Sequence, residues 1–125
     1  MFCAAGGART KILVVDDEPL IRLGLAFQAV DWGYEVVEAG SADEAIRELG
    51  LHPDIGLVIT DVDMPGSMYG VRLAHFVRER WPPIALIVVS GKLALKDGLL
   101  PAGCRFFEKP LRDDRLREAI LELTA

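Results

Sequence analysis

The sequence predicts an α/β fold built on a doubly wound parallel sheet. Five short apolar runs, rich in β-branched residues, recur at roughly regular intervals and are separated by helical patterns, as in buried parallel strands. Several runs end on an acidic or other polar residue. The strands are expected over residues 11–16, 34–39, 54–61, 84–90 and 104–108. Right-handed crossovers between such strands place helices on both faces of the sheet.

The first helix is predicted directly after the first strand. Asp17 is the expected N-cap, Glu18 and Pro19 suit the first turn, and Gly33 ends the helix. Its body is marked by apolar residues at helical spacing, namely Leu20, Leu23, Phe27 and Val30.

Two of the later helices have clear end signals. Ser41 and Glu44 form the Ser-x-x-Glu pattern of a capping box, which predicts that the second helix begins there. The third helix is expected to run to Trp81, because Pro82 and Pro83 follow it. The apolar residues that mark the third and last helices are Val71, Ala74 and Val77, then Leu116, Ile120 and Leu123.

The segment from residue 92 to residue 105 predicts only a short or irregular fourth helix. It carries Gly98, Pro101 and Gly103, which weaken or interrupt a helix. We therefore expect residues 92–103 to be the least ordered part of the domain. The predicted fold as a whole is flavodoxin-like, with about five helices around a five-stranded parallel sheet of strand order 2-1-3-4-5. Residues 10–125 are expected to form one domain, preceded by a disordered leader over residues 1–9.

The composition is that of a soluble globular chain. The 125 residues are 51% hydrophobic and 26% charged, and no apolar run is long enough for a membrane helix. A net charge of −5 argues against nucleic-acid binding. Cys3 and Cys104 resemble neither a disulfide framework nor a metal motif, which fits the cytoplasm.

Polar residues at the predicted strand ends indicate a functional site. Asp16 and Asp17 follow the first strand, Asp61 and Ser90 close the third and fourth, and Lys109 follows the last. Each residue alone has an ordinary explanation, such as a helix cap, a loop contact or a surface lysine. Because the carboxyl ends of strands in an open α/β sheet meet at the ligand crevice, their joint occurrence predicts a shared site.

The chemistry of this group favours a divalent cation and a phosphoryl group. Two carboxylates 4 Å apart repel each other by about 4 kcal/mol at an effective dielectric constant near 20, so the group needs either a bound cation or a carboxyl with a raised pKa. Mg²⁺ prefers such oxygen ligands, and Mn²⁺ is expected to substitute. Asp61 would be the nucleophile, Lys109 would neutralise charge, and Ser90 and the Gly91 amide would donate to phosphoryl oxygens.

The segments VVDDEP, TDVDMPG, VVSG and FFEKP, in this order, resemble the receiver domain of two-component response regulators. The resemblance covers residues 11–123 and implies that Asp61 is the phosphoacceptor. It implies a metal site formed by Asp16, Asp17, Asp61 and the backbone carbonyl of Asp63. It also implies that Ser90 and Phe106 are switch residues and that Lys109 binds phosphate. The Lys109–Pro110 bond is expected to be cis, as in that family.

The resemblance further implies a function and partners. The chain is similar to the stand-alone receivers of bacteria, which work in two-component signalling and phosphorelays. Such a protein takes its phosphoryl group from a sensor histidine kinase or a histidine phosphotransfer protein. It acts on an unidentified downstream protein, and it catalyses only its own phosphorylation and dephosphorylation. No nucleic-acid or membrane partner is expected.

The sequence departs from the family pattern in places, and two other functions remain as alternatives. The loop PGSMYG is one residue longer than usual, and Tyr69 stands where an acid commonly precedes the glycine. Asp61 and Asp63 also have the spacing of the nucleophile and general acid of haloacid-dehalogenase-type phosphatases, although their place on the third strand fits that family poorly. A third hypothesis is an adaptor that works without phosphorylation.

Overall fold

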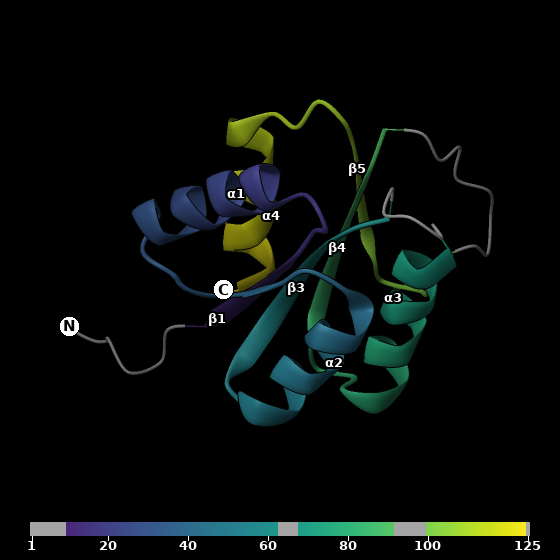
Figure 1. Ribbon diagram of the computed structural model, residues 1–125. Coiled ribbons are helices and arrows are strands. Elements are labelled where there is room, and N and C mark those ends of the chain that lie inside the picture. The colour runs from purple at the N-terminus through teal and green to yellow at the C-terminus, as the bar shows by residue number, and fades with distance from the viewer. Residues whose placement is uncertain (1–9, 63–67, 92–99, 125) are drawn as a thin grey trace.

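The structure is a computed structural model that describes residues 10–62, 68–91 and 100–124. Its elements follow the order predicted from the sequence, with five strands and, in this described part, four helices (Figure 1). In chain order these are β1 (Lys11–Val15), α1 (Pro19–Asp31), β2 (Glu35–Ala39), α2 (Ala42–Leu51), β3 (Ile55–Asp61), α3 (Met68–Arg80), β4 (Ala85–Ser90), β5 (Arg105–Glu108) and α4 (Asp113–Thr124).

All five strands are parallel and lie in the order β2-β1-β3-β4-β5, which confirms the predicted sheet. Helices α1 and α4 cover one face, and α2 and α3 cover the other (Figure 1). The expected fourth helix lies mostly in residues 92–99, outside the described residues. The leader over residues 1–9 and the loop over residues 63–67 also lie outside them.

The core consists of two apolar layers, one on each side of the sheet. Successive side chains of a strand point to opposite faces, so β1 contributes to both layers. Leu13 and Val15 pack with residues of α2 and α3, whereas Ile12 and Val14 pack with residues of α1 and α4. Strands β1, β3 and β4 are buried over nearly their whole length, which explains why their continuous apolar runs were recognisable.

Helix α1 begins one residue later than predicted. Its N-cap is Glu18, whose side chain accepts a hydrogen bond from the Leu20 amide, and not Asp17. The reason is Pro19, which stands at the first helical position and restricts the preceding residue to extended backbone. The end is as predicted, since Gly33 follows the C-cap Trp32 with a φ of 101°.

The apolar residues that mark α1 do not face the core. Leu20, Phe27 and Val30 are 78%, 66% and 54% exposed, and Leu23 is exposed as well. The helix instead packs on the sheet through small residues, Ala26 and Ala29, with Leu25 partly buried beside them. The helix prediction is confirmed, but the residues that led to it form an exposed apolar stripe.

The signals for the other helices are confirmed with small differences. Ser41 caps α2 by accepting from the Glu44 amide, while the Glu44 side chain accepts from the Gly40 amide and not from that of Ser41. Helix α3 ends at Arg80, and Trp81 follows it, still bonded through its amide to the Val77 carbonyl. Among the described helices none is long and apolar enough to cross a membrane.

Candidate functional site

The strand register brings the predicted site residues to one edge of the sheet. Val15 at the end of β1 pairs with Thr60 of β3, so Asp16 follows β1 beside the end of β3, where Asp61 lies. Asp61 in turn pairs with Val89 of β4, one residue before Ser90. The carboxyl ends of β1, β3, β4 and β5 therefore meet, as expected for the ligand edge of an open α/β sheet.

Lys109 and Asp61 form the central interaction of the site. The Lys109 Nζ donates a hydrogen bond to Asp61 Oδ2 at 2.7 Å, and the Asp61 side chain is only 8% exposed. The Lys109 amide donates to the Ser90 carbonyl, which ties the end of β5 to the end of β4. The Lys109–Pro110 bond is cis, as the sequence resemblance implied. Lys109 is thus held against the predicted nucleophile.

Asp16 is a buried carboxylate whose charge is unfavourable in this position. It is 4% exposed, and its Oδ1 accepts a hydrogen bond from the Glu18 amide. Burial raises the pKa of Asp16 above its usual range, and the negative charges of Asp61 and Asp17 raise it further. The Glu18 hydrogen bond and Lys109 act in the opposite direction but do not cancel the effect. A bound cation would offset this charge.

We predict that Asp16→Asn stabilises the protein in the absence of divalent cations. A carboxyl whose pKa is raised by folding opposes folding above that pKa, and stability recovers as the pH falls through it. The neutral amide removes this cost, so the melting temperature of Asp16→Asn should exceed that of the parent by a few degrees. Thermal melts at neutral pH in a chelator measure it, with Asp31→Asn at the exposed end of α1 as the control. Equal melting temperatures for Asp16→Asn and the parent would contradict the prediction.

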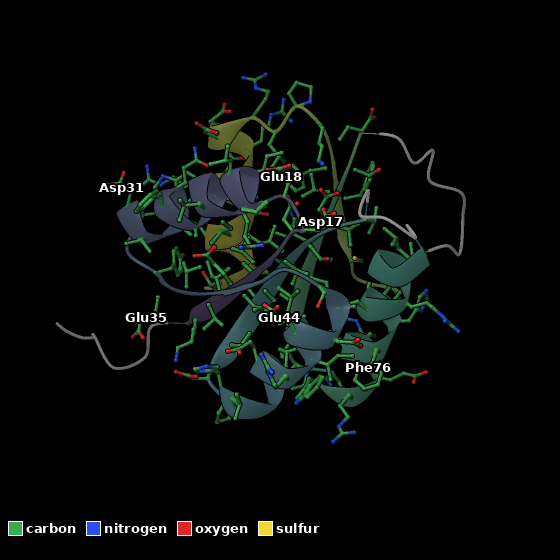
Figure 2. The ribbon with its side chains drawn as sticks, viewed as in Figure 1. Asp17, Glu18, Asp31, Glu35, Glu44 and Phe76 are labelled. Carbon is green, nitrogen blue, oxygen red and sulfur yellow. The ribbon has the colours of Figure 1, made fainter. Side chains whose placement is uncertain are left out.

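The other predicted site residues occupy positions of different kinds. Ser90 is buried at the end of β4, and Gly91 follows it at the surface. Phe106 is half-buried in β5 and packs against the apolar layer shared with α2 and α3. Asp17 is exposed at the start of α1 (Figure 2). Asp63, whose carbonyl is a predicted metal ligand, lies outside the described residues.

The donor set fits a magnesium ion held by few protein ligands. Over the described ranges, no three His, Cys, Asp or Glu side chains are gathered closely enough to hold a metal ion by themselves. Mg²⁺ does not require such a cage, because it usually binds through one or two carboxylates and keeps several waters. Asp16 and Asp61 supply two buried carboxylates whose mutual repulsion a cation relieves.

A thiol nucleophile is not a competing explanation among the described residues. Cys104 precedes β5 and is partly buried, and burial raises the pKa of its thiol to about 11. The thiolate is the reactive form, so Cys104 is nearly inert at neutral pH.

Two contacts of the acidic loop, residues 16–18, were not predicted from the sequence. Glu18 donates its amide to Asp16 and caps α1, and Arg22 donates from Nη1 to the Asp16 carbonyl at 2.9 Å. The sequence offers one sign of the Arg22 contact: Arg22 is a lone basic residue within the apolar run LIRLGLAF, shortly after the acidic pair. The partners of Arg22 are the Asp16 carbonyl, directly after β1, and Glu38 of β2, and local sequence patterns do not reveal that these lie together.

Comparisons with known proteins agree with the fold. The family model described as the response regulator receiver domain matches residues 12–121. A response regulator receiver domain protein from Clostridium thermocellum superimposes with a TM-score of 0.83 at 30% identity, covering 92% of this chain and 94% of that one. A response regulator receiver protein from Pseudomonas putida gives a TM-score of 0.82 at 30% identity, with 95% and 99% covered.

Curated relatives are longer proteins. The hydrogenase transcriptional regulatory protein HoxA of Cupriavidus necator is 37% identical over 116 residues, which are 90% of this chain and 23% of that protein. The transcriptional activator protein ExaE of Pseudomonas putida is 37% identical over 119 residues, 91% of this chain and 55% of that protein. The chain thus spans between about a quarter and about half of these two relatives. With the family model matching most of its length, the chain belongs to the response regulator receiver domain family.

Proposed function

We propose that this chain is a magnesium-dependent phosphoacceptor switch. Asp61 takes a phosphoryl group from a sensor histidine kinase or a histidine phosphotransfer protein, and the phosphorylated chain signals through contacts with another protein. The observation that carries this proposal is the Lys109–Asp61 pair, a cation 2.7 Å from a buried carboxylate beside a second buried acid.

The residues suit nucleophilic attack on phosphorus. An oxygen of the Asp61 carboxylate forms a bond to the phosphorus of a phosphohistidine, and the phosphorus–nitrogen bond breaks with its electrons passing to the imidazole. Lys109 holds Oδ2, so it orients the carboxylate and offsets the charge on the transferred group. A bound Mg²⁺ supplies charge neutralisation and positioning for the phosphoryl oxygens. Asp16 and Asp61 would hold it, with Asp17 and the Asp63 carbonyl as further proposed ligands.

The exposed stripe of α1 supports docking of a protein phosphodonor. The stripe begins at Leu20, two residues after Glu18, and continues through Leu23, Phe27 and Val30 away from the acidic loop. Acidic residues stand at both ends of the helix, with Asp17 and Glu18 at its start and Asp31 at its end (Figure 2). We propose that a helix of the phosphodonor, apolar on one side and basic at its ends, covers this stripe.

Docking on α1 predicts a selective defect in Phe27→Asp. Transfer from a purified histidine kinase that phosphorylates the parent chain should slow by tenfold or more, because a charge then enters an apolar contact. Loading from the small donor acetyl phosphate should not change, since this donor needs no docking surface. The matched control is Leu51→Asp, an equally exposed leucine on α2 at the other face of the sheet. Equal slowing with both donors would contradict docking at this stripe.

The nature of the output stays a prediction. The two curated relatives are named as transcriptional regulators, and each is longer than the part that matches this chain. Action as a stand-alone receiver, through protein contacts alone, is therefore part of the proposal.

Loading with a small phosphodonor tests the proposed function. The purified chain is incubated with acetyl phosphate and Mg²⁺, and its intact mass is measured over time. We expect a gain of one phosphoryl group per chain, which disappears when a chelator is present. Continuous release of phosphate from p-nitrophenyl phosphate at many turnovers per minute would instead favour the phosphatase hypothesis. Binding of a partner protein with no mass gain under any of these conditions would favour the adaptor.

A further inference from the structure

Arg22 connects three separate parts of the fold beside the acidic loop. From its place in the first turns of α1, its Nη1 donates to the Asp16 carbonyl at 2.9 Å. Its Nε donates to Glu38 Oε1 of β2 at 3.0 Å. The side chain is 22% exposed, so the guanidinium is partly shielded from water. Planar guanidinium groups suit such double contacts, because their donors are fixed in direction.

The carbonyl that Arg22 holds belongs to the peptide group that joins Asp16 to Asp17. Rotation of that peptide would turn both acidic side chains relative to Asp61. Asp16 is already fixed at two other points, since its amide donates to the Ala39 carbonyl at 3.1 Å and its carboxylate accepts from the Glu18 amide. Arg22 supplies the third contact and thereby fixes the orientation of the peptide.

The space around the guanidinium is closely fitted. A Cβ added at Gly40, directly after β2, would lie 3.1 Å from Arg22 Nη1. Glu38 stands two residues earlier in the chain and holds the other side of the guanidinium. The end of β2 therefore sets the position of Arg22, although β2 contributes no predicted ligand to the site.

We propose that Arg22 is a positioning residue for the divalent cation, acting through the Asp16–Asp17 peptide without touching the ion. This inference rests on the proposed function, because it assumes a cation beside Asp16 and Asp61. Groups that orient metal ligands in this indirect way typically account for tenfold to hundredfold in metal affinity. The arginine would hold the acidic loop in its binding conformation before the ion arrives, which lowers the cost of ordering the loop on binding.

The test measures cation binding with no phosphodonor present. Free Mn²⁺ is followed by electron paramagnetic resonance while the parent chain and Arg22→Met are titrated into it. Methionine keeps most of the apolar stem of Arg22 and removes the hydrogen bonds that the guanidinium donates to Asp16 and Glu38. We expect the Mn²⁺ dissociation constant to rise about tenfold in Arg22→Met. The matched control is Arg47→Met, an exposed arginine of α2, which should bind Mn²⁺ as the parent does.

Two further variants disturb the contacts of the Arg22 guanidinium while leaving the arginine in place. Gly40→Ala places a methyl group against Nη1, and Glu38→Gln removes the charge that anchors Nε. Both should weaken Mn²⁺ binding in the same direction as Arg22→Met, but by less. They keep the inference testable if Arg22→Met does not fold.

A structural role alone would have a different signature. Binding of a ligand to the folded state raises stability by an amount set by its concentration and dissociation constant. If Arg22 positions the ligands, the rise in melting temperature on adding Mg²⁺ shrinks in Arg22→Met. If Arg22→Met lowers the melting temperature equally with and without Mg²⁺ and its Mn²⁺ affinity is unchanged, the inference is wrong. If the parent chain itself binds neither cation, the proposed function fails as well.

Discussion

Asp61→Asn is expected to abolish phosphorylation from acetyl phosphate. Asparagine has nearly the same shape and can still accept the hydrogen bond from Lys109, but its neutral amide cannot form the acyl phosphate. The intact mass should therefore stay that of the unmodified chain at donor and Mg²⁺ concentrations that load the parent fully. This is the largest functional effect that the site predicts.

The control separates loss of the nucleophile from loss of the fold. Asp31→Asn removes an exposed acid at the far end of α1, and it should load like the parent (Figure 2). Asp61→Asn should still be folded in a chelator at the temperature of the loading assay, because the amide keeps the shape of the carboxylate and can accept the hydrogen bond from Lys109. A full phosphoryl gain in Asp61→Asn would show that another residue is the acceptor.

Gly70→Ala is expected to destabilise the protein and to impair the site. A Cβ at Gly70 of α3 would lie 2.6 Å from the Cα of Val62, the residue directly after Asp61. Because this contact is with backbone, either α3 or the end of β3 must move. Overpacking of this kind costs about 1–3 kcal/mol. Thermal or urea unfolding measures the loss, and the rate of loading from acetyl phosphate should fall with it.

Gly50→Ala is the matched substitution on α2. A Cβ at Gly50 meets nothing within 4 Å, and alanine favours a helix over glycine by up to about 1 kcal/mol. The two variants should therefore shift stability in opposite directions. If Gly70→Ala is as stable as the parent, the close packing of α3 on the residue after Asp61 is not present in solution.

The sheet and the main site residues could be predicted because both depend on simple patterns. The buried strands are continuous apolar runs, so each observed strand begins and ends within one residue of its predicted bounds. Parallel strands bring their carboxyl ends together, so Asp16, Asp61, Ser90 and Lys109 could be assigned to one edge. The contact between Lys109 and Asp61 shows that these two residues do lie together, while their roles as cation and nucleophile stay predictions.

What could not be predicted depends on contacts between distant segments. Helix α1 is apolar on more than one side, so periodicity identified the helix but not the side that contacts the sheet. The small residues Ala26 and Ala29 allow the close approach, and the large ones stay outside. Arg22 was not singled out from the sequence, because its partners, the Asp16 carbonyl directly after β1 and Glu38 of β2, are brought to it only by the fold.

Mapping the phosphoryl group within the chain tests the central claim most directly. The chain is loaded with acetyl phosphate and Mg²⁺ and reduced with borodeuteride, which converts an aspartyl phosphate into deuterated homoserine. Peptide mass spectrometry then locates the modified residue. We predict deuterated homoserine at position 61 in the loaded sample and at no position when Mg²⁺ is chelated. Modification at Asp16, Asp17 or any other residue in place of Asp61, or no modification at all, would contradict the assignment of Asp61 as the phosphoacceptor.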